Sequence, residues 1–390
     1  MERQATTPDF YRYRWHGLSS AGVDGHFIEL RWPDGKTHRA FDLWLYENVV
    51  GRSIDEATRE SVLDPAQLDL SVTAGEVSLT DDGALRIVWE PDSDRRFEAV
   101  YHPGWLRHVA DGHHLPSSGL PDQRPWRSDD LVEPPTHDGP TVMADGDAMD
   151  RWVDDLLRYG IARLRRLPLD PDLALSLAGR LGAVRDTNFG PIWDVKAEVD
   201  PGSTANTNYR LCPHTDLPTR ETPPGFQFLH CIANTVSGGH STMADGLAVV
   251  DHLRTEHPDH YRALTTLKWV FFNRGASVDH RWSGPIIDLG VAGSPLTLRA
   301  FHPVRGFPDM AEADLPRAYA ALHCFATVAA DSRFQLRYPM APGDLVGFDN
   351  RRILHGRDGY GSDGHRHLRG LYIDHDEIKS FARMAARRRA

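Results

Sequence analysis

The chain has 390 residues, of which 40% are hydrophobic, so it can bury a large core and form two domains. Its formal net charge of −11 argues against nucleic acid or an anionic membrane as the main partner. Its three cysteines, Cys212, Cys231 and Cys324, are not closely paired, which indicates neither a disulfide framework nor a cysteine-rich zinc site. Because it has no apolar run long enough to span a bilayer and no signal-peptide core, we expect a cytoplasmic protein.

The first block, residues 1–110, is predicted to form a small β-rich domain. Apolar and polar residues alternate there in short segments separated by PDG, DDG and HPG turns, a pattern typical of strands. The segments are residues 26–32, 37–45, 68–74, 76–80, 84–90 and 95–102. Residues 111–140 are rich in Pro, Gly, Asp and Ser, which predicts a linker.

The second block, residues 141–390, is predicted to be mainly β with covering helices. Helical spacing of apolar residues occurs in residues 148–160, 171–182 and 313–330. Strand-like runs occupy residues 225–234, 267–273, 284–290, 295–302, 334–339, 344–349 and 367–374. This pattern favours a double-stranded β-helix, the jelly-roll relative, although pattern alone also allows a β-sandwich.

The triplet His214-Thr215-Asp216 is the most informative motif, and His355 follows 141 residues after His214. In an extended strand, residues i and i+2 point to the same side, so His214 and Asp216 can face one metal ion. Two imidazoles and one carboxylate on one face of Fe(II) leave three positions for a chelating co-substrate and O₂. A second such triplet, His257-Pro258-Asp259, lies in a polar stretch, where it indicates a helix boundary and no function.

Two long stretches around these ligands, residues 213–246 and 343–377, resemble the γ-butyrobetaine hydroxylase and trimethyllysine hydroxylase branch of the TauD-like 2-oxoglutarate dioxygenases. The resemblance covers most of residues 140–385 and, in outline, the first block. It implies a double-stranded β-helix that holds iron at one end, with Fe(II) as the metal and 2-oxoglutarate and O₂ as co-substrates. It also implies a homodimer.

Arg366 is the residue that the resemblance assigns to the distal carboxylate of 2-oxoglutarate, because the family places this arginine about a dozen residues after the last iron ligand. A guanidinium group can bind a carboxylate through two parallel hydrogen bonds. If the region is a strand, Arg366 shares a face with Tyr372, whereas Arg369 lies on the other face. Ser241 falls where relatives offer a hydroxyl group to the same carboxylate; a serine after Gly-Gly is also common in turns.

The resemblance also indicates substrate-binding residues. Aromatic rings hold a trimethylammonium group in this branch, because π faces attract a cation that cannot donate hydrogen bonds. Phe189, Trp193 and Tyr372 align with such positions, although each could equally pack in the core. Asn206 and Leu217 stand where γ-butyrobetaine hydroxylases usually have tyrosine, and His302 stands where an asparagine contacts the substrate carboxylate. Asn273 and Arg274 could bind an anionic end of the substrate, or simply form a strand-terminal turn.

Three hypotheses follow. The first is a 2-oxoglutarate-dependent hydroxylase that acts on an unactivated C–H bond of a small zwitterion, a betaine. The second keeps the catalyst but changes the substrate to an amino acid, phosphonate, sulfonate or natural-product intermediate. The reaction would then be hydroxylation, desaturation or cyclisation. Asn206, Leu217 and His302 favour this hypothesis. The third is a non-catalytic β-barrel binding protein, which the intact ligand set and Arg366 oppose.

We predict that the N-terminal domain binds no structural zinc. Many members of this branch bind zinc there through clustered cysteines, and thiolates dominate closed zinc sites. The corresponding stretch here, residues 44–60, contains no cysteine. Metal analysis of the purified protein after removal of iron should therefore find no stoichiometric zinc, and one zinc ion per chain would contradict this prediction.

Overall fold

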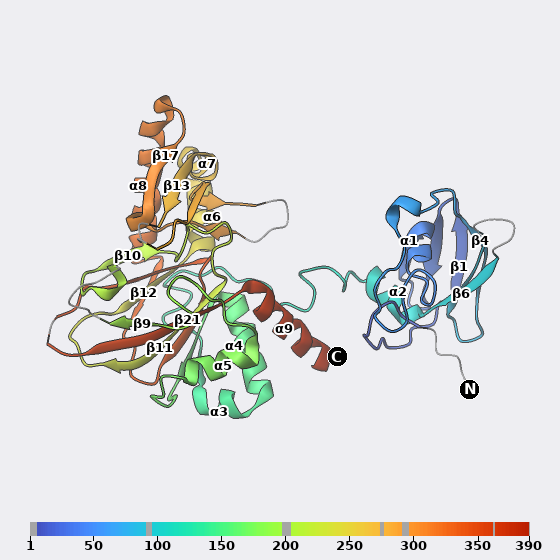
Figure 1. Cartoon of the computed structure of the whole chain (residues 1–390), viewed down its shortest axis with the longest axis horizontal. Coiled ribbons are helices and arrows are strands. Elements are labelled where there is room, and N and C mark those ends of the chain that lie inside the picture. The colour runs from blue at the N-terminus through green and yellow to red at the C-terminus, as the bar shows by residue number, and fades with distance from the viewer. Residues whose placement is uncertain are drawn as a thin grey trace. The chain divides into compact units, whose positions relative to one another are not determined.

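The computed structural model describes residues 6–90, 96–196, 204–273, 277–290, 296–361 and 363–389. The chain forms two compact units, Met1–Ser118 and Gly119–Ala390 (Figure 1). Each unit has its own buried hydrophobic core. No helix among these described residues is long and apolar enough to cross a membrane.

The described part of the N-terminal unit contains two three-stranded antiparallel sheets and two α-helices. One sheet has the order β1 (Ser20–Asp24), β2 (Phe27–Arg31), β3 (Thr37–Phe41), and the other β4 (Ala74–Leu79), β5 (Leu85–Trp89), β6 (Phe97–Tyr101). The helices are α1 (Asp42–Glu47) and α2 (Pro103–Ala110). The predicted strand 37–45 therefore ends at Phe41, where Asp42 supplies the acidic charge that favours a helix N-terminus. Most of the predicted strand 68–74 is irregular.

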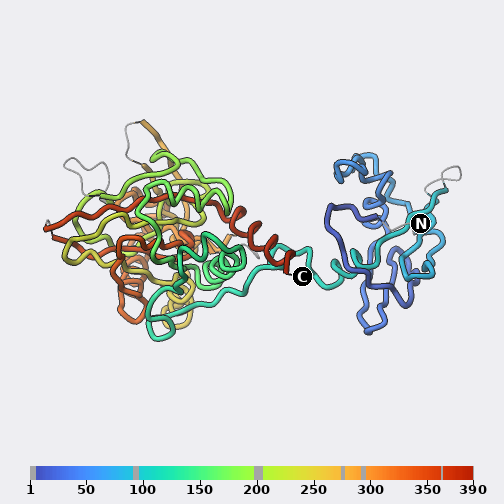
Figure 2. The backbone as a smooth tube through the Cα atoms, turned by 90° about the horizontal axis from the view of Figure 1, so that it is seen from below, coloured from blue at the N-terminus to red at the C-terminus, as the bar shows by residue number. Residues whose placement is uncertain are grey.

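The second unit is built on two sheets that share a buried cluster, and Figure 2 traces its backbone. The six-stranded sheet has the order β7 (Thr136–Asp138), β8 (Ile161–Arg165), β19 (Leu345–Asp349), β11 (Phe226–Asn234), β21 (Arg366–Ile373), β9 (Trp193–Lys196). The four-stranded sheet has the order β10 (Leu211–His214), β20 (Ile353–Arg357), β12 (Ser241–Asp245), β18 (Gln335–Tyr338). Side chains from both sheets form one buried cluster that includes Met243, Phe348, Ile353 and Leu368. This arrangement fits the predicted jelly-roll core.

Helices cover this core on two sides (Figure 1). The outer face of the six-stranded sheet packs against α4 (Gly146–Tyr159), α5 (Leu173–Leu181) and α9 (His375–Arg389), with α3 (Gly139–Ala144) beside α4. A second layer contains α6 (Gly246–Glu256), α7 (Pro258–Thr266), α8 (Leu315–Ala330) and the small sheets β14 (Arg281–Gly284), β13 (Lys268–Phe272), β17 (Arg305–Asp309) and β15 (Ile287–Asp288), β16 (Thr297–Leu298). His257 lies between α6 and α7, at the predicted helix boundary.

The irregular segment before β7 is tied to the rest of the second unit by hydrogen bonds to a buried ion pair. Asp245 and Arg352 are almost completely buried, and their side chains approach to 2.7 Å. The Trp126 backbone N–H donates to Asp245, and Arg352 donates to the carbonyl oxygens of Arg124 and Arg158. Arg352 immediately precedes β20, so this network also fixes the start of the strand that carries His355.

Replacing one member of the buried Asp245–Arg352 pair should strongly destabilise the protein. Asp245→Asn leaves the Arg352 guanidinium buried beside a neutral group, so we expect a loss of about 3–5 kcal/mol in the free energy of unfolding. The exposed pair Arg389–Asp154 is the control, and Arg389→Ala should cost about 0–1 kcal/mol. Denaturant unfolding of both variants measures this, and equal losses would contradict the prediction.

Candidate active site

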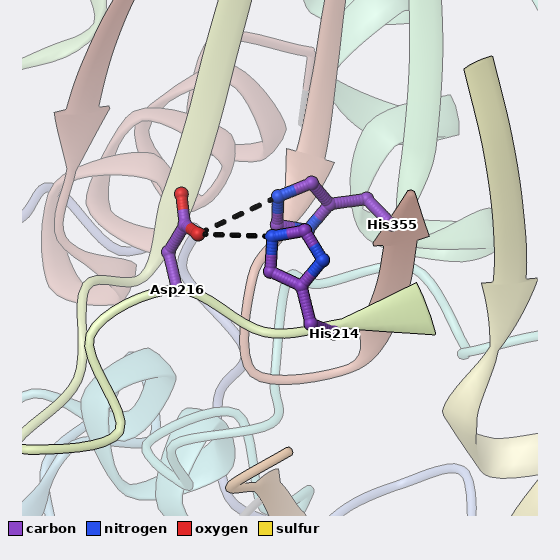
Figure 3. Close-up of side chains that lie close together, drawn as sticks. All are labelled: His214, Asp216 and His355. Carbon is purple, nitrogen blue, oxygen red and sulfur yellow. Dashed lines mark ion pairs between the residues drawn. The ribbon is translucent and has the colours of Figure 1, made fainter. Parts of the chain in front are cut away.

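His214, Asp216 and His355 converge at one end of the core. The pairing of β10 with β20 places His214 directly opposite His355. Asp216 Oδ1 lies 3.4 Å from His214 Nε2 and 3.6 Å from His355 Nε2 (Figure 3). All three donor atoms lie within 4.8 Å of one another, close enough to bind one metal ion. Among the described residues this is the only group of three or more His, Cys, Asp or Glu side chains with such spacing.

The donor set is already suited to a divalent cation. Burial, followed by the nearby His214, lowers the pKa of His355 to about 3, so this imidazole is neutral at physiological pH. His214 Nδ1 lies 2.8 Å from the Cys212 carbonyl oxygen, which favours the tautomer whose Nε2 lone pair faces the site. Burial raises the pKa of Asp216, but its partners, among them the Tyr372 hydroxyl that donates to it, outweigh burial and hold this pKa below its ordinary value. Metal binding therefore requires little proton loss.

Asp216 reaches the site from a bend and not from a strand. The strand β10 ends at His214, and Leu217 has a φ of +52°, a left-handed conformation that is unfavourable for a branched side chain. The Asn350 side chain holds this bend from both sides: it accepts from the Asp216 N–H (2.7 Å) and donates to the Asp216 carbonyl oxygen (3.1 Å). The expected strand geometry is thus replaced by a side-chain amide that supplies the missing backbone partners.

Tyr372 orients the carboxylate of Asp216. Its hydroxyl donates to Asp216 Oδ2 at 2.7 Å, which leaves Oδ1 facing the two histidines. Burial and the Asp216 charge raise the pKa of Tyr372, so the phenol keeps the proton that it donates. Tyr372 is buried and lies on β21, in the opposite sheet from His355.

A cavity of about 530 Å³ opens beside the metal-binding side chains. His214 and Asp216 line it, together with most of the predicted substrate residues: Phe189, Trp193, Asn206, Leu217, Asn273 and Tyr372. The rings of Trp193 and Tyr372 lie with their centroids 4.2 Å apart. Gly370 makes this contact possible, because a Cβ atom there would lie 2.6 Å from the indole of Trp193.

Arg366, Ser241 and His302 are not among the residues that line this cavity. Arg366 and Ser241 are buried on β21 and β12. His302 lines a second cavity of about 600 Å³ and lies 3.1 Å from Arg305 Nη2. Arg274 lies outside the described residues. Asn350, inside the segment 343–377, is a further site residue; its signal in the sequence is a polar residue in the turn between two apolar strands.

Comparison with known proteins is consistent with this geometry. Residues 122–372 match the taurine catabolism dioxygenase TauD, TfdA family. The chain belongs to this family.

Three relatives of this dioxygenase match over almost the whole chain. It is 35% identical to the γ-butyrobetaine dioxygenase of Pseudomonas sp. (strain AK-1), over 93% of this chain and 94% of the relative. It is 29% identical to the human γ-butyrobetaine dioxygenase, over 94% and 96%, and 24% identical to the trimethyllysine dioxygenase of Meyerozyma guilliermondii, over 94% and 95%.

Family and site together establish the reaction class. The protein is a non-haem dioxygenase that uses Fe(II), 2-oxoglutarate and O₂, as predicted. The two-histidine, one-carboxylate set matches the face that such iron sites present.

The dioxygenase should lose metal affinity when Asn350 is removed. Asn350→Ala deletes both hydrogen bonds to the Asp216 backbone, so we expect Mn(II), used in place of Fe(II), to bind about 10–100-fold more weakly in calorimetric titration. The control is Arg351→Ala, which removes hydrogen bonds to the Pro223 carbonyl oxygen in the same loop but none to Asp216. An equal loss of affinity in both variants would refute a specific role for Asn350.

Proposed function

We propose that this dioxygenase hydroxylates an unactivated C–H bond of a small betaine, a zwitterion with a quaternary ammonium group. The Trp193–Tyr372 ring pair on the wall of the cavity beside the metal-binding side chains is the observation that carries the proposal. Aromatic faces attract a quaternary ammonium group by about 0.5–2 kcal/mol. The printed names of the relatives, γ-butyrobetaine and trimethyllysine dioxygenases, support the same substrate class.

The carboxylates of the cavity also favour a quaternary over a primary ammonium group. Among the described residues that line it, only Asp194 and Asp216 are acidic. Tyr372 occupies one oxygen of Asp216 and the two histidines face the other. Asp194 Oδ1 lies 2.9 Å from His367 Nε2. A primary ammonium group would find no carboxylate without a partner, whereas a trimethylammonium group needs none.

His214, Asp216 and His355 hold the iron in this proposal, and Arg366 and Ser241 bind the distal carboxylate of 2-oxoglutarate. When bound, iron with 2-oxoglutarate and O₂ supplies the oxidation, in which the keto acid becomes succinate and CO₂ and one oxygen atom enters the substrate C–H bond. The contrast between two neighbouring arginines supports Arg366. It is buried and makes no ion pair with a described residue, whereas Arg369 lies 3.4 Å from Asp194 and 3.5 Å from Asp172.

A second candidate keeps the catalyst and changes the substrate to an amino acid, phosphonate, sulfonate or natural-product intermediate. The observation that favours it is the position of Asn206 and Leu217 on the cavity wall. Both stand where the resemblance implies tyrosine, so the aromatic enclosure of a cation has fewer rings. Asn273, on the same wall, could bind an anionic end of either substrate.

We also propose a cytoplasmic homodimer. The three free cysteines fit a reducing compartment. The dimer is proposed by likeness to the branch named above, with the N-terminal unit as the packing element.

The test compares γ-butyrobetaine with 4-aminobutyrate, which has the same chain and a primary amine. We expect 2-oxoglutarate-dependent succinate formation with γ-butyrobetaine and little with 4-aminobutyrate. His214→Ala should abolish it, because one metal donor is lost. Trp193→Leu should raise the KM for γ-butyrobetaine about tenfold, and Trp193→Phe, which keeps an aromatic face, should raise it less.

Other outcomes would redirect the proposal. Faster turnover of 4-aminobutyrate, or of a phosphonate or sulfonate analogue, would favour the second candidate. Undiminished turnover by His214→Ala would overturn the assignment of the metal site.

A further inference from the structure

Arg357 and Arg366 are two buried arginines without an acidic partner. Their exposed fractions are 4% and 5%. Within the described parts of the chain, neither guanidinium group forms an ion pair with a carboxylate, and the Nε atom of each has no hydrogen-bond partner. Both guanidinium groups lie near the ring of Tyr360, at 4.7 Å and 5.7 Å from its centroid. Burying two like charges is costly, so this place favours an external anion.

The same interior face connects Arg357 to the proposed co-substrate site. On β20, Ile353, His355 and Arg357 alternate with outward residues, and Ile353 belongs to the cluster between the two sheets. Ser241 on β12 is the direct antiparallel partner of Arg357. Residues opposite each other in such a pair point to the same side. Arg357 therefore shares its face with a metal ligand and with a proposed ligand of the 2-oxoglutarate carboxylate.

The other nitrogens of Arg357 hold the backbone of a loop. Its Nη1 donates to the Ala205 carbonyl oxygen at 3.3 Å, and its Nη2 donates to those of Thr207 at 2.6 Å and Tyr209 at 2.9 Å. The loop, residues 204–210, contains only one short 3₁₀ turn and no strand, so these contacts take the place of a strand ladder. Ala205 and Asn206 of this loop line the substrate cavity.

We propose that Arg357 is a positioning residue that links the co-substrate to the wall of the substrate cavity. When the distal carboxylate of 2-oxoglutarate binds beside Arg366, it offsets the repulsion between the two guanidinium groups. Arg357 then keeps its three hydrogen bonds to the loop with less electrostatic repulsion from Arg366. The loop 204–210 is therefore held more firmly against the cavity. This inference rests on the proposed binding of the distal 2-oxoglutarate carboxylate by Arg366.

The linkage has a thermodynamic consequence. If the co-substrate stabilises the loop, an ordered loop must strengthen co-substrate binding by the same factor. Arg357→Lys would keep the positive charge. Its single ammonium group lacks the planar guanidinium fork with which arginine reaches three carbonyl oxygens. Arg357→Lys should therefore separate the charge from the positioning role.

The experiment measures amide hydrogen exchange of residues 204–210 in the full chain loaded with Mn(II), with and without N-oxalylglycine, an unreactive mimic of 2-oxoglutarate. In the unaltered protein we expect the mimic to slow exchange there by about fivefold or more. In Arg357→Lys this protection should disappear although the mimic still binds. Arg337→Lys is the matched control, because Arg337 lies on β18 and pairs with Asp358, and it should retain the protection.

Calorimetric titration of N-oxalylglycine distinguishes the possible failures. Binding without protection in the unaltered protein would overturn this inference and leave the proposed function intact. No binding at all would overturn both. Loss of binding by more than tenfold in Arg357→Lys would make Arg357 a direct ligand and contradict a positioning role. Tyr360→Phe gives a second measurement: it removes one hydrogen bond to the Thr207 carbonyl oxygen, and protection should fall only in part.

Discussion

The pairing of β10 with β20 is the constraint on which the chemistry of this protein depends. It sets His214 opposite His355, and the pairing of β20 with β12 sets Ser241 opposite Arg357. Side chains alternate between the two faces of a strand, so a slip of one residue would send His355 and Arg357 outward together. The apolar neighbours fix this register, because Ile353 on the same face is buried between the sheets. The metal site and the proposed co-substrate site are therefore consequences of one hydrophobic pattern.

The parts of the site that lie outside strands are held by side chains. A loop has no ladder for its N–H and C=O groups, so buried polar side chains must replace it. Asn350 does this for Asp216, and Arg357 does it for residues 205–209. Arg299, also buried, donates to the carbonyl oxygens of Pro218, Arg220 and Glu221 in the loop that follows the metal-binding bend. Several buried polar side chains of this unit thus replace ladder hydrogen bonds where irregular backbone approaches the iron site.

The sequence predicts the helices and strands that depend on apolar periodicity. It does not predict the contacts that depend on irregular bends of the backbone. The helix α4 and the strands β11 and β19 match their predicted segments within one or two residues, because apolar spacing decides them. The donor set was also readable, since His214, Asp216 and His355 do converge. The role of Asn350 could not be read from the sequence. It depends on a contact with the Asp216 backbone, 134 residues away, next to the left-handed residue Leu217. Such a contact leaves no periodic trace.

Tyr372 belongs to the metal site and to the substrate cavity at once. Its hydroxyl orients Asp216, and its ring packs against Trp193 on the cavity wall. A side chain with two such contacts cannot move for one without disturbing the other, because one rigid phenol ring carries both. Changes in substrate preference are then easiest at cavity positions that do not touch the metal ligands. Asn206 lines the cavity and takes no part in the Tyr372–Asp216 contact, so we expect such changes there.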